Sequence, residues 1–423
     1  MRIEQGESKN TFLTTIDTDK PLVCLLLSIQ LPATKNHTET AARTMYGELL
    51  LSGAGKYTRT EFLSALNDLG ARIEVSYHDS VVTLKLSCLA QHAKKVSSLI
   101  AVMIFDPHFK QKEIVRVKRN LSNQLKEVSE DARQVALIGF TQAIYTSTDH
   151  RYRPLPQQLL AKVNEVKRSD ILQVHQSVHA SRWFVSIAAP KEEARLFSTI
   201  LHPTSELNVT SILHSTHYRS TPTKLTLVDV PAKQNIELAI GSALPLSLSE
   251  PEYASASFAI SVLGIWGGFA GRLMSTVREK EGLTYAAYAR TEAASKLAPG
   301  HWRIFTFFDP NNTEKGIESV RRQLESMHKR GISQSELERF KKILHTRDVL
   351  VYDSLAELIE RIHLLSISNL SFAEYVKLRD RVQQLTRTDV NQVVKNYLDP
   401  QQLCISAAGP TSNIAKQLTT RYS

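Results

Sequence analysis

The chain has 423 residues, which is too long for a single hydrophobic core and suits about two to four domains. Hydrophobic residues make up 42% and charged residues 22%, a composition that is typical of a globular protein and excludes a disordered or fibrous one. The net charge of +10 is scattered along predicted helices, and no zinc-knuckle, RNA-stacking or helix-turn-helix pattern accompanies it, so we expect no nucleic-acid partner.

The cysteines and the N-terminal residues bear on the compartment. Cys24, Cys88 and Cys404 each lie in an apolar, strand-like run, where free thiols are commonly buried as small hydrophobic side chains. The apolar run at residues 22–29 is too short to span a bilayer, and residues 1–10 contain no hydrophobic signal region. We therefore expect no membrane partner and a cytoplasmic protein, or a periplasmic one if a signal peptide was removed.

The first half of the chain reads as a sheet with helices. Alternating apolar residues predict strands, and apolar residues at helical spacing predict helices. The expected elements are two strands within 11–31, a helix capped by Thr38 or Thr40 and ending at Leu51, a helix at 62–70, a hairpin at 73–88, helices at 96–103 and 113–129, a mostly helical stretch at 133–180 with a loop around 150–156, and a strand at 184–188.

The second half repeats the order of the first. Residues 191–222 lose periodicity and gather Ser, Thr and Pro, which predicts a linker. The elements expected after it are strands at 225–230 and 236–240, a helix at 253–263, a glycine-rich region at 264–290, a strand at 302–308, helices at 313–330, 334–350, 352–367 and 386–397, and a strand at 403–407.

Two segments make this internal repeat checkable residue by residue. The segment 163–170 matches 382–389 at an offset of 219 residues (389 − 170), and 183–190 matches 403–410 at an offset of 220 (410 − 190). Ser169 and Thr388 are good candidates for helix N-caps in the two copies. We therefore predict a domain at 1–190, a linker at 191–222 and a homologous domain at 223–423, each a sheet covered by helices.

The most informative stretch is residues 263–290. It opens on a glycine turn at 264–271, continues as an amphipathic helix, breaks at Gly282 and becomes a strand from Tyr285. Arg278 and Tyr285 are seven positions apart across this helix-to-strand corner, so a cation and a phenol can face one spot. Spacing alone also allows a surface Arg278 and a half-buried Tyr285 without a function.

The full pattern of this stretch is more specific than the pair. The glycine turn, Gly271-Arg272-Leu273, Arg278-Glu279-Lys280 and Gly282-Leu283-Thr284-Tyr285 together resemble the C-terminal-domain signature of the pitrilysin/insulinase (M16, M16B-like) zinc peptidases. The two-copy order resembles the M16 layout over almost the whole chain. The resemblance implies an α+β fold of two homologous α/β-roll domains, each a mostly antiparallel sheet covered by helices, the LuxS/MPP-like metallohydrolase fold.

The resemblance also implies a role for Arg278 and Tyr285. In the family an Arg and a Tyr at this spacing contact the substrate near the metal. Arg278 would offer a planar cation to a peptide carbonyl or carboxylate, and Tyr285 a neutral donor to the oxyanion of a tetrahedral intermediate. Neither group hydrolyses a peptide without an activated water.

The zinc motif of active family members is missing. They carry HxxEH on the first helix, where two histidines at i and i+4 share one helix face and the Glu activates the metal-bound water, with a further Glu downstream. In this chain the His, Glu and His positions are Thr44, Gly47 and Glu48, and the distal Glu position falls at Gln124. We therefore expect no metal and no other cofactor in this chain.

Other metal or phosphate motifs are weaker. His175 and His179 lie at i and i+4 on a predicted helix, but no Asp, Glu or Cys stands near as a third ligand. The run 37–39 (HTE) begins like a deaminase signature but lacks its PCxxC half. The glycine turn at 264–271 lacks the spacing and the GK[ST] of a phosphate loop.

The expected function follows from the Arg/Tyr pair that the chain keeps and the zinc motif that it lacks. M16 peptidases include pairs in which one subunit carries HxxEH and the other carries the Arg/Tyr pair. We expect the second kind: a heterodimer subunit that binds a peptide substrate, is inactive alone, and donates Arg278 and Tyr285 to a zinc-bearing partner, with a homodimer in the partner's absence as a further option. The alternative is a non-enzymatic peptide-binding or assembly-scaffold homologue, whereas a mitochondrial-processing-type regulatory subunit would need a longer glycine-rich loop.

Overall fold

The computed structural model describes residues 2–8, 10–202, 216–265 and 267–422, and these form two compact units. The first unit takes 1–125, 157–213 and 350–372, and the second takes 126–156, 214–349 and 373–423. These units do not follow the contiguous boundaries predicted from the sequence, because a segment of each half of the chain packs with the other half's sheet. Residues 203–215 of the predicted linker lie outside the described residues.

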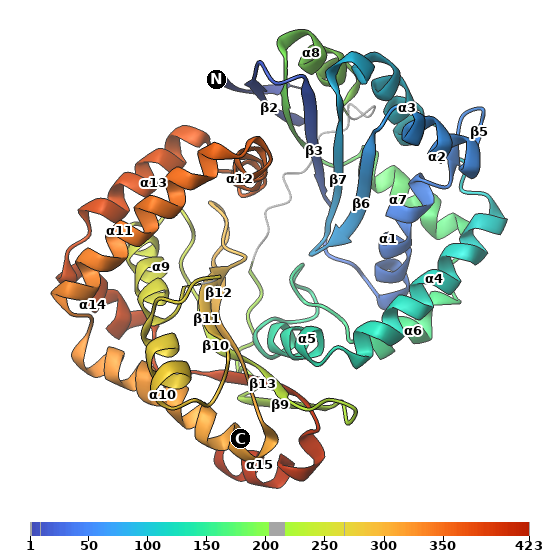
Figure 1. The fold of residues 1–423 in the computed structure, drawn as a ribbon. Helices are drawn as coiled ribbons and strands as arrows, with labels where there is room; N and C mark the ends of the chain where they lie inside the picture. The colour runs from blue at the N-terminus through green and yellow to red at the C-terminus, as the bar shows by residue number, and fades with distance from the viewer. Residues whose placement is uncertain (1, 9, 203–215, 266, 423) are drawn as a thin grey trace. The chain divides into compact units, whose positions relative to one another are not determined.

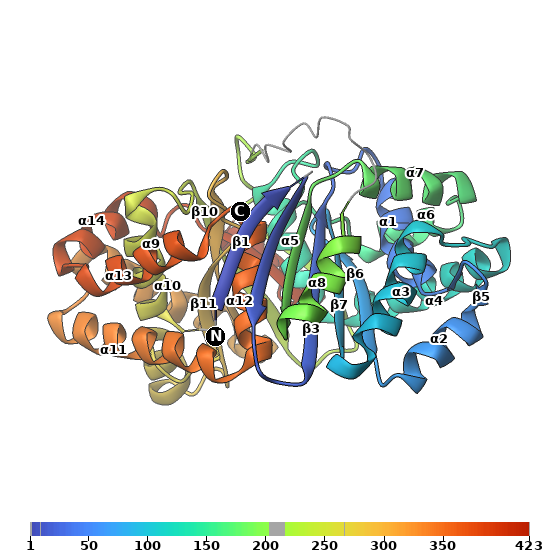
Figure 2. The same ribbon diagram turned by 90° about the horizontal axis from the view of Figure 1, so that it is seen from above.

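The first unit is built on a six-stranded sheet in the order β1-β2-β8-β3-β7-β6. Only β2 and β8 pair in parallel, and every other neighbouring pair is antiparallel. Figure 2 shows the strands of this sheet side by side, with β1 outermost. The strands are β1 (Arg2–Ser8), β2 (Thr11–Asp17), β3 (Leu22–Gln30), β6 (Arg72–His78), β7 (Val81–Leu89) and β8 (Trp183–Ala189).

Helices cover both faces of this sheet (Figure 1). Alternate residues of β3, such as Leu25 and Leu27, enter the main core under the helices of the first half, whereas Leu26 points to the opposite face and packs against α12. The helices are α1 (His37–Leu50), α2 (Arg59–Asp68), α3 (Ala93–Phe105), α4 (Gln111–Glu130), α6 (Pro156–Val163), α7 (Arg168–His179), α8 (Lys191–Ile200) and α12 (Leu355–Ile367), and a short hairpin, β4 (Gly53–Ala54) with β5 (Tyr57–Thr58), follows α1.

The second unit has a five-stranded sheet in the order β11-β12-β10-β13-β9, in which only β13 and β9 are parallel. One face carries the larger core, and α5 (Ala132–Ile144) covers the other, so closely that a Cβ on Gly139 would lie 2.4 Å from the Ser406 hydroxyl. The remaining elements are β9 (Leu225–Asp229), β10 (Ile236–Leu244), β11 (Ala287–Glu292), β12 (Gly300–Phe308), β13 (Cys404–Gly409), α9 (Pro251–Leu263), α10 (Thr313–Arg330), α11 (Gln334–Leu350), α13 (Phe372–Gln384), α14 (Arg387–Tyr397) and α15 (Ala415–Tyr422).

The two sheets confirm the predicted repeat. In the first, β8 lies between a parallel partner, β2, and an antiparallel one, β3; in the second, β13 lies in the same way between β9 and β10. Asp170 and Asp389 occupy equivalent places, because each carboxylate accepts the backbone N–H three residues earlier, at Lys167 and Thr386. The predicted α+β class with two homologous, mostly antiparallel sheets is therefore correct.

The helix caps predicted from the sequence are wrong by two to four residues. α7 and α14 begin after Lys167 and Thr386 rather than after Ser169 and Thr388, since Asp170 and Asp389 cap them from inside the first turn. α1 begins after Asn36, whose side chain accepts the Glu39 N–H, and not after Thr38 or Thr40.

Several elements were also missed. The predicted linker begins with α8, because Ala194, Phe197 and Leu201 recur at helical spacing and are buried against the first unit's core. β1, α13 and α15 have no counterpart in the prediction. Among the described residues, no helix combines the length and the apolarity needed to cross a bilayer.

Candidate functional site

The glycine turn at 264–271 follows α9 and runs along β11, the edge strand of the second sheet. Ile265 forms a parallel bridge with Ala289 of β11, and the Ala289 N–H donates to the Gly264 carbonyl at 3.0 Å. Gly271 has φ +121°, and a Cβ there would lie 2.7 Å from the Gly264 Cα. Only glycine fits this close approach, so the turn depends on Gly271. Position 266 lies outside the described residues.

The segment after the turn is a π-helix, Met274–Lys280, and not the α-helix that the sequence predicts. Its five-residue register appears in the hydrogen bond from the Glu281 N–H to the Thr276 carbonyl (2.9 Å), and the Leu283 N–H donates to the Val277 carbonyl, six positions back, at the end of the helix (3.0 Å). Its apolar side, Met274 and Val277, is buried. Such helices are rare and occur often at functional sites. Here the wider helix sets the direction in which Arg278 points.

The structure brings the two sequence-predicted site residues, Arg278 and Tyr285, into contact. The guanidinium carbon of Arg278 lies 4.8 Å from the ring centroid of Tyr285 and 4.9 Å from that of Phe269, in two cation–π contacts. Both rings are largely exposed, Tyr285 at 68% and Phe269 at 65%. We call Phe269, Arg278 and Tyr285 the Arg278 cluster. Phe269 was missed from the sequence; the available signal was an aromatic residue inside a glycine turn.

Arg278 has no ion-pair or hydrogen-bond partner for its side chain among the described residues. Charged neighbours are bound elsewhere: Arg272 forms a two-pronged pair with Glu336 (both 2.7 Å) and also donates to the Gly331 carbonyl at 2.9 Å. Glu281 accepts from Arg322 at 2.7 Å. The Arg278 cluster therefore presents an uncompensated cation between two aromatic rings, which suits an incoming acceptor.

The pair between Arg272 and Glu336 fixes the start of the π-helix on α11. Burial alone would raise the pKa of the Glu336 carboxyl, but hydrogen bonds from Arg272 and from Ser333 outweigh burial and hold that pKa below its usual range. Glu336 is thus charged at neutral pH, and the ion pair persists there. The Gly271-Arg272-Leu273 motif thus supplies both the glycine that the turn needs and the arginine that anchors the turn to α11.

The degenerate zinc positions in the first unit are filled by the chain's own contacts. Thr44 donates its hydroxyl to the Thr40 carbonyl of its own helix at 2.8 Å. Glu48 accepts from Arg116 of α4 at 2.5 Å and from Asn120 at 2.8 Å, and Arg116 also pairs with Glu113 at 2.8 Å. Gln124 is exposed on the same helix, α4. Thr, Gly, Glu and Gln do not form a zinc-ligand set, and the Glu48 carboxylate already has a cation.

Packing around Gly47 also leaves no room for the Glu of the zinc motif. A Cβ at this position would lie 2.7 Å from the carbonyl oxygen of Val75 on β6 and 3.1 Å from its Cγ1. The obstruction is backbone, which cannot move aside as a flexible side chain can. The Glu that activates water in the family has no room here while α1 rests on β6. Among the described residues, no group of three or more His, Cys, Asp or Glu gathers to hold a metal.

His175 and His179 lie together, and each imidazole contacts a group of the first unit. Their ring centroids are 4.6 Å apart, and His175 shares a hydrogen bond of 2.8 Å with the Tyr46 hydroxyl while His179 lies 3.2 Å from the Ile104 carbonyl. Burial lowers the pKa of His179 and, with the neighbouring imidazole, that of His175 to about 4. Both are neutral packing residues: His175 lies beside Phe109 and His179 beside Phe105, and the His179 Nδ1 is buried without a hydrogen-bond partner among the described residues. The HTE run at 37–39 is simply the first turn of α1.

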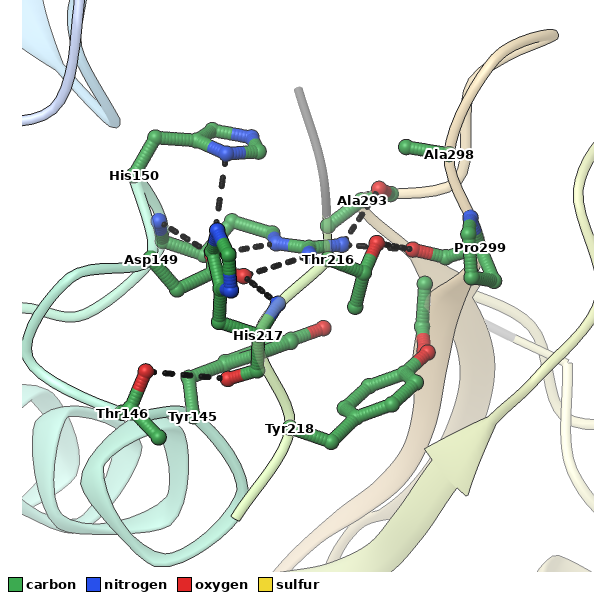
Figure 3. A network of polar contacts seen from close by, with 12 residues as sticks. Tyr145, Thr146, Asp149, His150, Thr216, His217, Tyr218, Ala293, Ala298 and Pro299 are labelled. Carbon is green, nitrogen blue, oxygen red and sulfur yellow. Dashed lines mark hydrogen bonds and ion pairs between the residues drawn. The ribbon is translucent and has the colours of Figure 1, made fainter. Parts of the chain in front are cut away.

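A second polar cluster lies in the second unit, where the chain leaves α5 (Figure 3). Asp149 and Arg151 form a buried two-pronged ion pair, and Asp149 also accepts the His217 N–H at 2.8 Å. Arg151 donates to the carbonyls of Ala293 and Pro299, and its guanidinium carbon lies 4.2 Å from the Tyr145 ring centroid. Every strong donor of Arg151 thus has a partner, so this cluster anchors the segment and offers no free group.

The network continues from Tyr145 toward β12. The Tyr145 hydroxyl lies 2.8 Å from His301 Nδ1, and His301 faces Glu292, which is paired with Arg303 and Arg290. Burial would raise the pKa of Glu292, but bonds and charges from His301 and Arg303 outweigh it and lower that pKa strongly. An ionised, fully paired carboxylate is a structural group and not a base for catalysis.

The fold contains two similar sheet-and-helix repeats, and positions Thr44, Gly47 and Glu48 provide no zinc-ligand set. Residues 194–344 match the family model described as the peptidase M16 inactive domain. The chain is 19% identical over 362 residues to the "Non-peptidase homolog YmxG" of Helicobacter pylori, covering 84% of this chain and 81% of that protein. These matches show an M16 inactive domain at residues 194–344 and a likeness of most of the chain to a relative that is named a non-peptidase homologue.

Solved structures with the same fold agree with this assignment. A peptidase M16 inactive domain from Pseudomonas fluorescens superposes with a TM-score of 0.81 at 18% identity, over 97% of this chain and 99% of that one. A protease from Helicobacter pylori gives 0.82 at 13% identity over 96% and 99%, and a conserved protein from Enterococcus faecalis V583 gives 0.75 at 18% over 96% and 98%. At these identities the likeness establishes the fold alone.

Proposed function

We propose that this chain is the non-zinc subunit of a heterodimeric M16 peptidase, which binds a peptide and donates Arg278 and Tyr285 to a site completed by an HxxEH-bearing partner. The observation that carries the proposal is the contact of an unpaired Arg278 with two exposed rings. A surface arginine without a ligand gains little from such an arrangement, and two large exposed aromatic side chains are costly in water.

The chemistry of the two groups supports this role. The Arg278 guanidinium donates in a plane toward a peptide carbonyl or carboxylate. The exposed Tyr285 hydroxyl is free to donate to a carbonyl oxygen as it gains charge, a contact worth about 3 kcal/mol in comparable sites. Neither group activates water, and the Thr44, Gly47 and Glu48 positions supply no substitute. The zinc and the activating Glu must therefore come from the partner.

The test is reconstitution with an M16 subunit that carries HxxEH. The mixture should cleave a quenched fluorescent peptide, while this chain alone should not. Arg278→Ala and Tyr285→Phe should each lower kcat/KM of the mixture by about tenfold to a hundredfold. Tyr285→Phe is the sharper variant, because it keeps the ring beside Arg278 and removes only the hydroxyl. Leu297→Ala, at an exposed position of the same unit, is the matched control. Full activity of both variants would refute the role.

A second candidate is a non-enzymatic peptide-binding or assembly-scaffold protein. The names of the matching family model and of the Helicobacter pylori relative, "inactive domain" and "non-peptidase homolog", favour it. Under this alternative the chain associates with itself or with other proteins but changes no partner's kcat/KM. Co-purification with an HxxEH subunit followed by the same cleavage assay separates the two functions.

A further inference from the structure

We propose that the Arg278 cluster is a carboxylate-binding site with Phe269 as its third contact residue, and that the peptides it selects carry a carboxylate, either at the C-terminus or on an acidic side chain. The inference rests on the proposed peptide-binding function and narrows it to a substrate class. It adds a residue, Phe269, that neither the family resemblance nor the spacing of Arg278 and Tyr285 points to.

Charge is the first argument. Arg278 has no anionic partner among the described residues, whereas Arg272 is neutralised by Glu336 and Arg322 by Glu281. The adjacent Glu279 is exposed and makes no ion pair with Arg278 in the described part of the chain. A ligand that brings its own negative charge compensates this cation, and a neutral peptide carbonyl does not.

Geometry is the second argument. The ring centroids of Phe269 and Tyr285 lie 4.9 Å and 4.8 Å from the guanidinium carbon, so the rings exclude water from much of the group. The N–H groups along the guanidinium edge then remain for hydrogen bonding. This edge matches two oxygens held in one plane, as in a carboxylate, and a single carbonyl oxygen uses only part of it.

The surroundings of the cluster keep this geometry in place. Gly271 sets the turn that carries Phe269, and Arg272 with Glu336 anchors the beginning of the π-helix that carries Arg278. Tyr285 stands at the end of the corner that Gly282 opens at φ +62°. The three side chains therefore come from one short segment whose backbone is fixed at three points, and binding needs little rearrangement.

The experiment measures binding by the full-length chain to fluorescein-labelled decapeptide pools with randomised internal positions. One pool has a free C-terminal carboxylate and no acidic side chain, and a second is the same pool amidated. A third is amidated with one central Glu, and a fourth has Gln in its place. A fifth is amidated with one phosphoserine. Fluorescence anisotropy then gives the affinity of each pool, and the two acidic arms distinguish the C-terminal from the side-chain source.

At least one carboxylate-bearing pool should bind about tenfold more tightly than its neutral counterpart, and Arg278→Gln should abolish the difference. Phe269→Leu, which keeps an apolar side chain but removes the aromatic ring, should weaken only the carboxylate-bearing pool, by about two- to fivefold. Leu297→Ala should change nothing. The preference should also decline as salt rises, since it depends on the attraction between the Arg278 guanidinium and the carboxylate.

The outcomes separate the two proposals. If neutral and acidic pools bind alike and Arg278→Gln weakens both, the carboxylate inference fails while the peptide-binding function stands. If only the phosphoserine pool binds tightly, the inference is also overturned, in favour of a phosphate site. If no pool shows binding that depends on Arg278, both proposals fail.

Discussion

Arg116 of α4 donates a hydrogen bond of 2.5 Å to the carboxylate of Glu48 on α1, which stands at the second histidine position of the family's zinc motif. The same guanidinium donates to the Ser52 hydroxyl at 2.9 Å and pairs with Glu113. A cation belonging to the chain thus joins α1 to α4 beside the place where the active enzymes hold a metal. The positions that lack zinc ligands are therefore held together by hydrogen bonds and ion pairs within the chain.

Restoring the ligands should not restore the metal site. The variant Thr44→His/Gly47→Glu/Glu48→His places HxxEH on α1, but any side chain at position 47 meets the Val75 backbone. Even Gly47→Ala should destabilise the fold by about 1–3 kcal/mol. We expect the triple variant to unfold at a lower temperature than the Thr44→His/Glu48→His control, with no stoichiometric zinc by elemental analysis. Full zinc occupancy at an unchanged unfolding temperature would show that α1 and β6 separate easily.

Arg272 should hold the π-helix in place. Arg272→Met leaves the partly buried Glu336 without its cation, which should cost about 1–3 kcal/mol and loosen residues 272–285. Limited trypsin digestion should then cut sooner at Arg278 or Lys280. Lys162→Met is the control, because both partners of its pair with Glu165 are largely solvated and its loss should cost less than about 1 kcal/mol. Equal digestion rates in both variants would contradict the anchoring role.

The buried pair between Asp149 and Arg151 should matter much more than surface pairs. Arg151→Met leaves an unpaired carboxylate in the interior and removes the donor to the Pro299 carbonyl (2.6 Å), which should cost about 3–5 kcal/mol. Arg219 lies on an exposed stretch and donates to the Gln142 carbonyl at 2.8 Å, so Arg219→Met should cost less than about 1 kcal/mol. Thermal unfolding of the two variants measures the difference, and similar midpoints would mean that water reaches Asp149.

The packing of α12, which comes from the second half of the chain, on the first unit's sheet can be tested with two substitutions in this helix. Ile362 is fully buried against that unit's sheet, whereas Leu364, two positions on, is 61% exposed. Ile362→Ala should cost about 2–5 kcal/mol, and Leu364→Ala should stay within about 0.5 kcal/mol. Hydrogen exchange of the amides of β3 and β8 reports the stability of this unit. Unchanged exchange in both variants would mean that α12 does not cover the sheet in solution.

The sequence predicts what local periodicity and internal repetition determine. Val82, Leu84, Leu86 and Cys88 alternate, and all four are buried on one face of β7. The 163–170 repeat places its two aspartates at equivalent helix starts, although the caps themselves were misassigned. In the candidate site, spacing across a helix-to-strand corner allowed Arg278 and Tyr285 to face one spot, and the full flanking pattern favoured a pair; the structure brings the two side chains into contact.

What the sequence did not reveal depends on contacts between distant segments. α5 and α12 have ordinary helical patterns, and nothing in either tells which sheet it covers, so contiguous domain boundaries were the natural prediction. The partner of Glu48 is Arg116, 68 positions away on another helix. Phe269 reaches Arg278 only because the backbone takes positive φ at Gly267 and Gly271 and a π-helix follows, a combination that hydrophobic periodicity does not encode.

His363 should make the first unit sensitive to acid. It is buried on α12 with Nδ1 2.9 Å from the Ser186 hydroxyl and Nε2 2.9 Å from that of Ser28. Burial, with a smaller contribution from the charge of Lys85, lowers its pKa from 6.5 to about 3. The folded state therefore keeps the imidazole neutral while the unfolded chain binds a proton below about pH 6.5. This stability is fully present above that pH and is lost as the pH falls toward 3; His175, with its pKa of about 4, acts in the same direction.

Between about pH 7 and about pH 5 this group should remove roughly 1–2 kcal/mol from the free energy of unfolding. His363→Gln keeps an amide that can bond the serine hydroxyls but does not titrate, so its stability should fall less over the same interval even if it starts lower. His345→Gln, at an exposed position, is the control and should follow the native chain. Hydrogen exchange of β3 and β8 at the two pH values, corrected for intrinsic rates, gives the comparison. An equal loss in His363→Gln and the native chain would show that other groups carry the acid sensitivity.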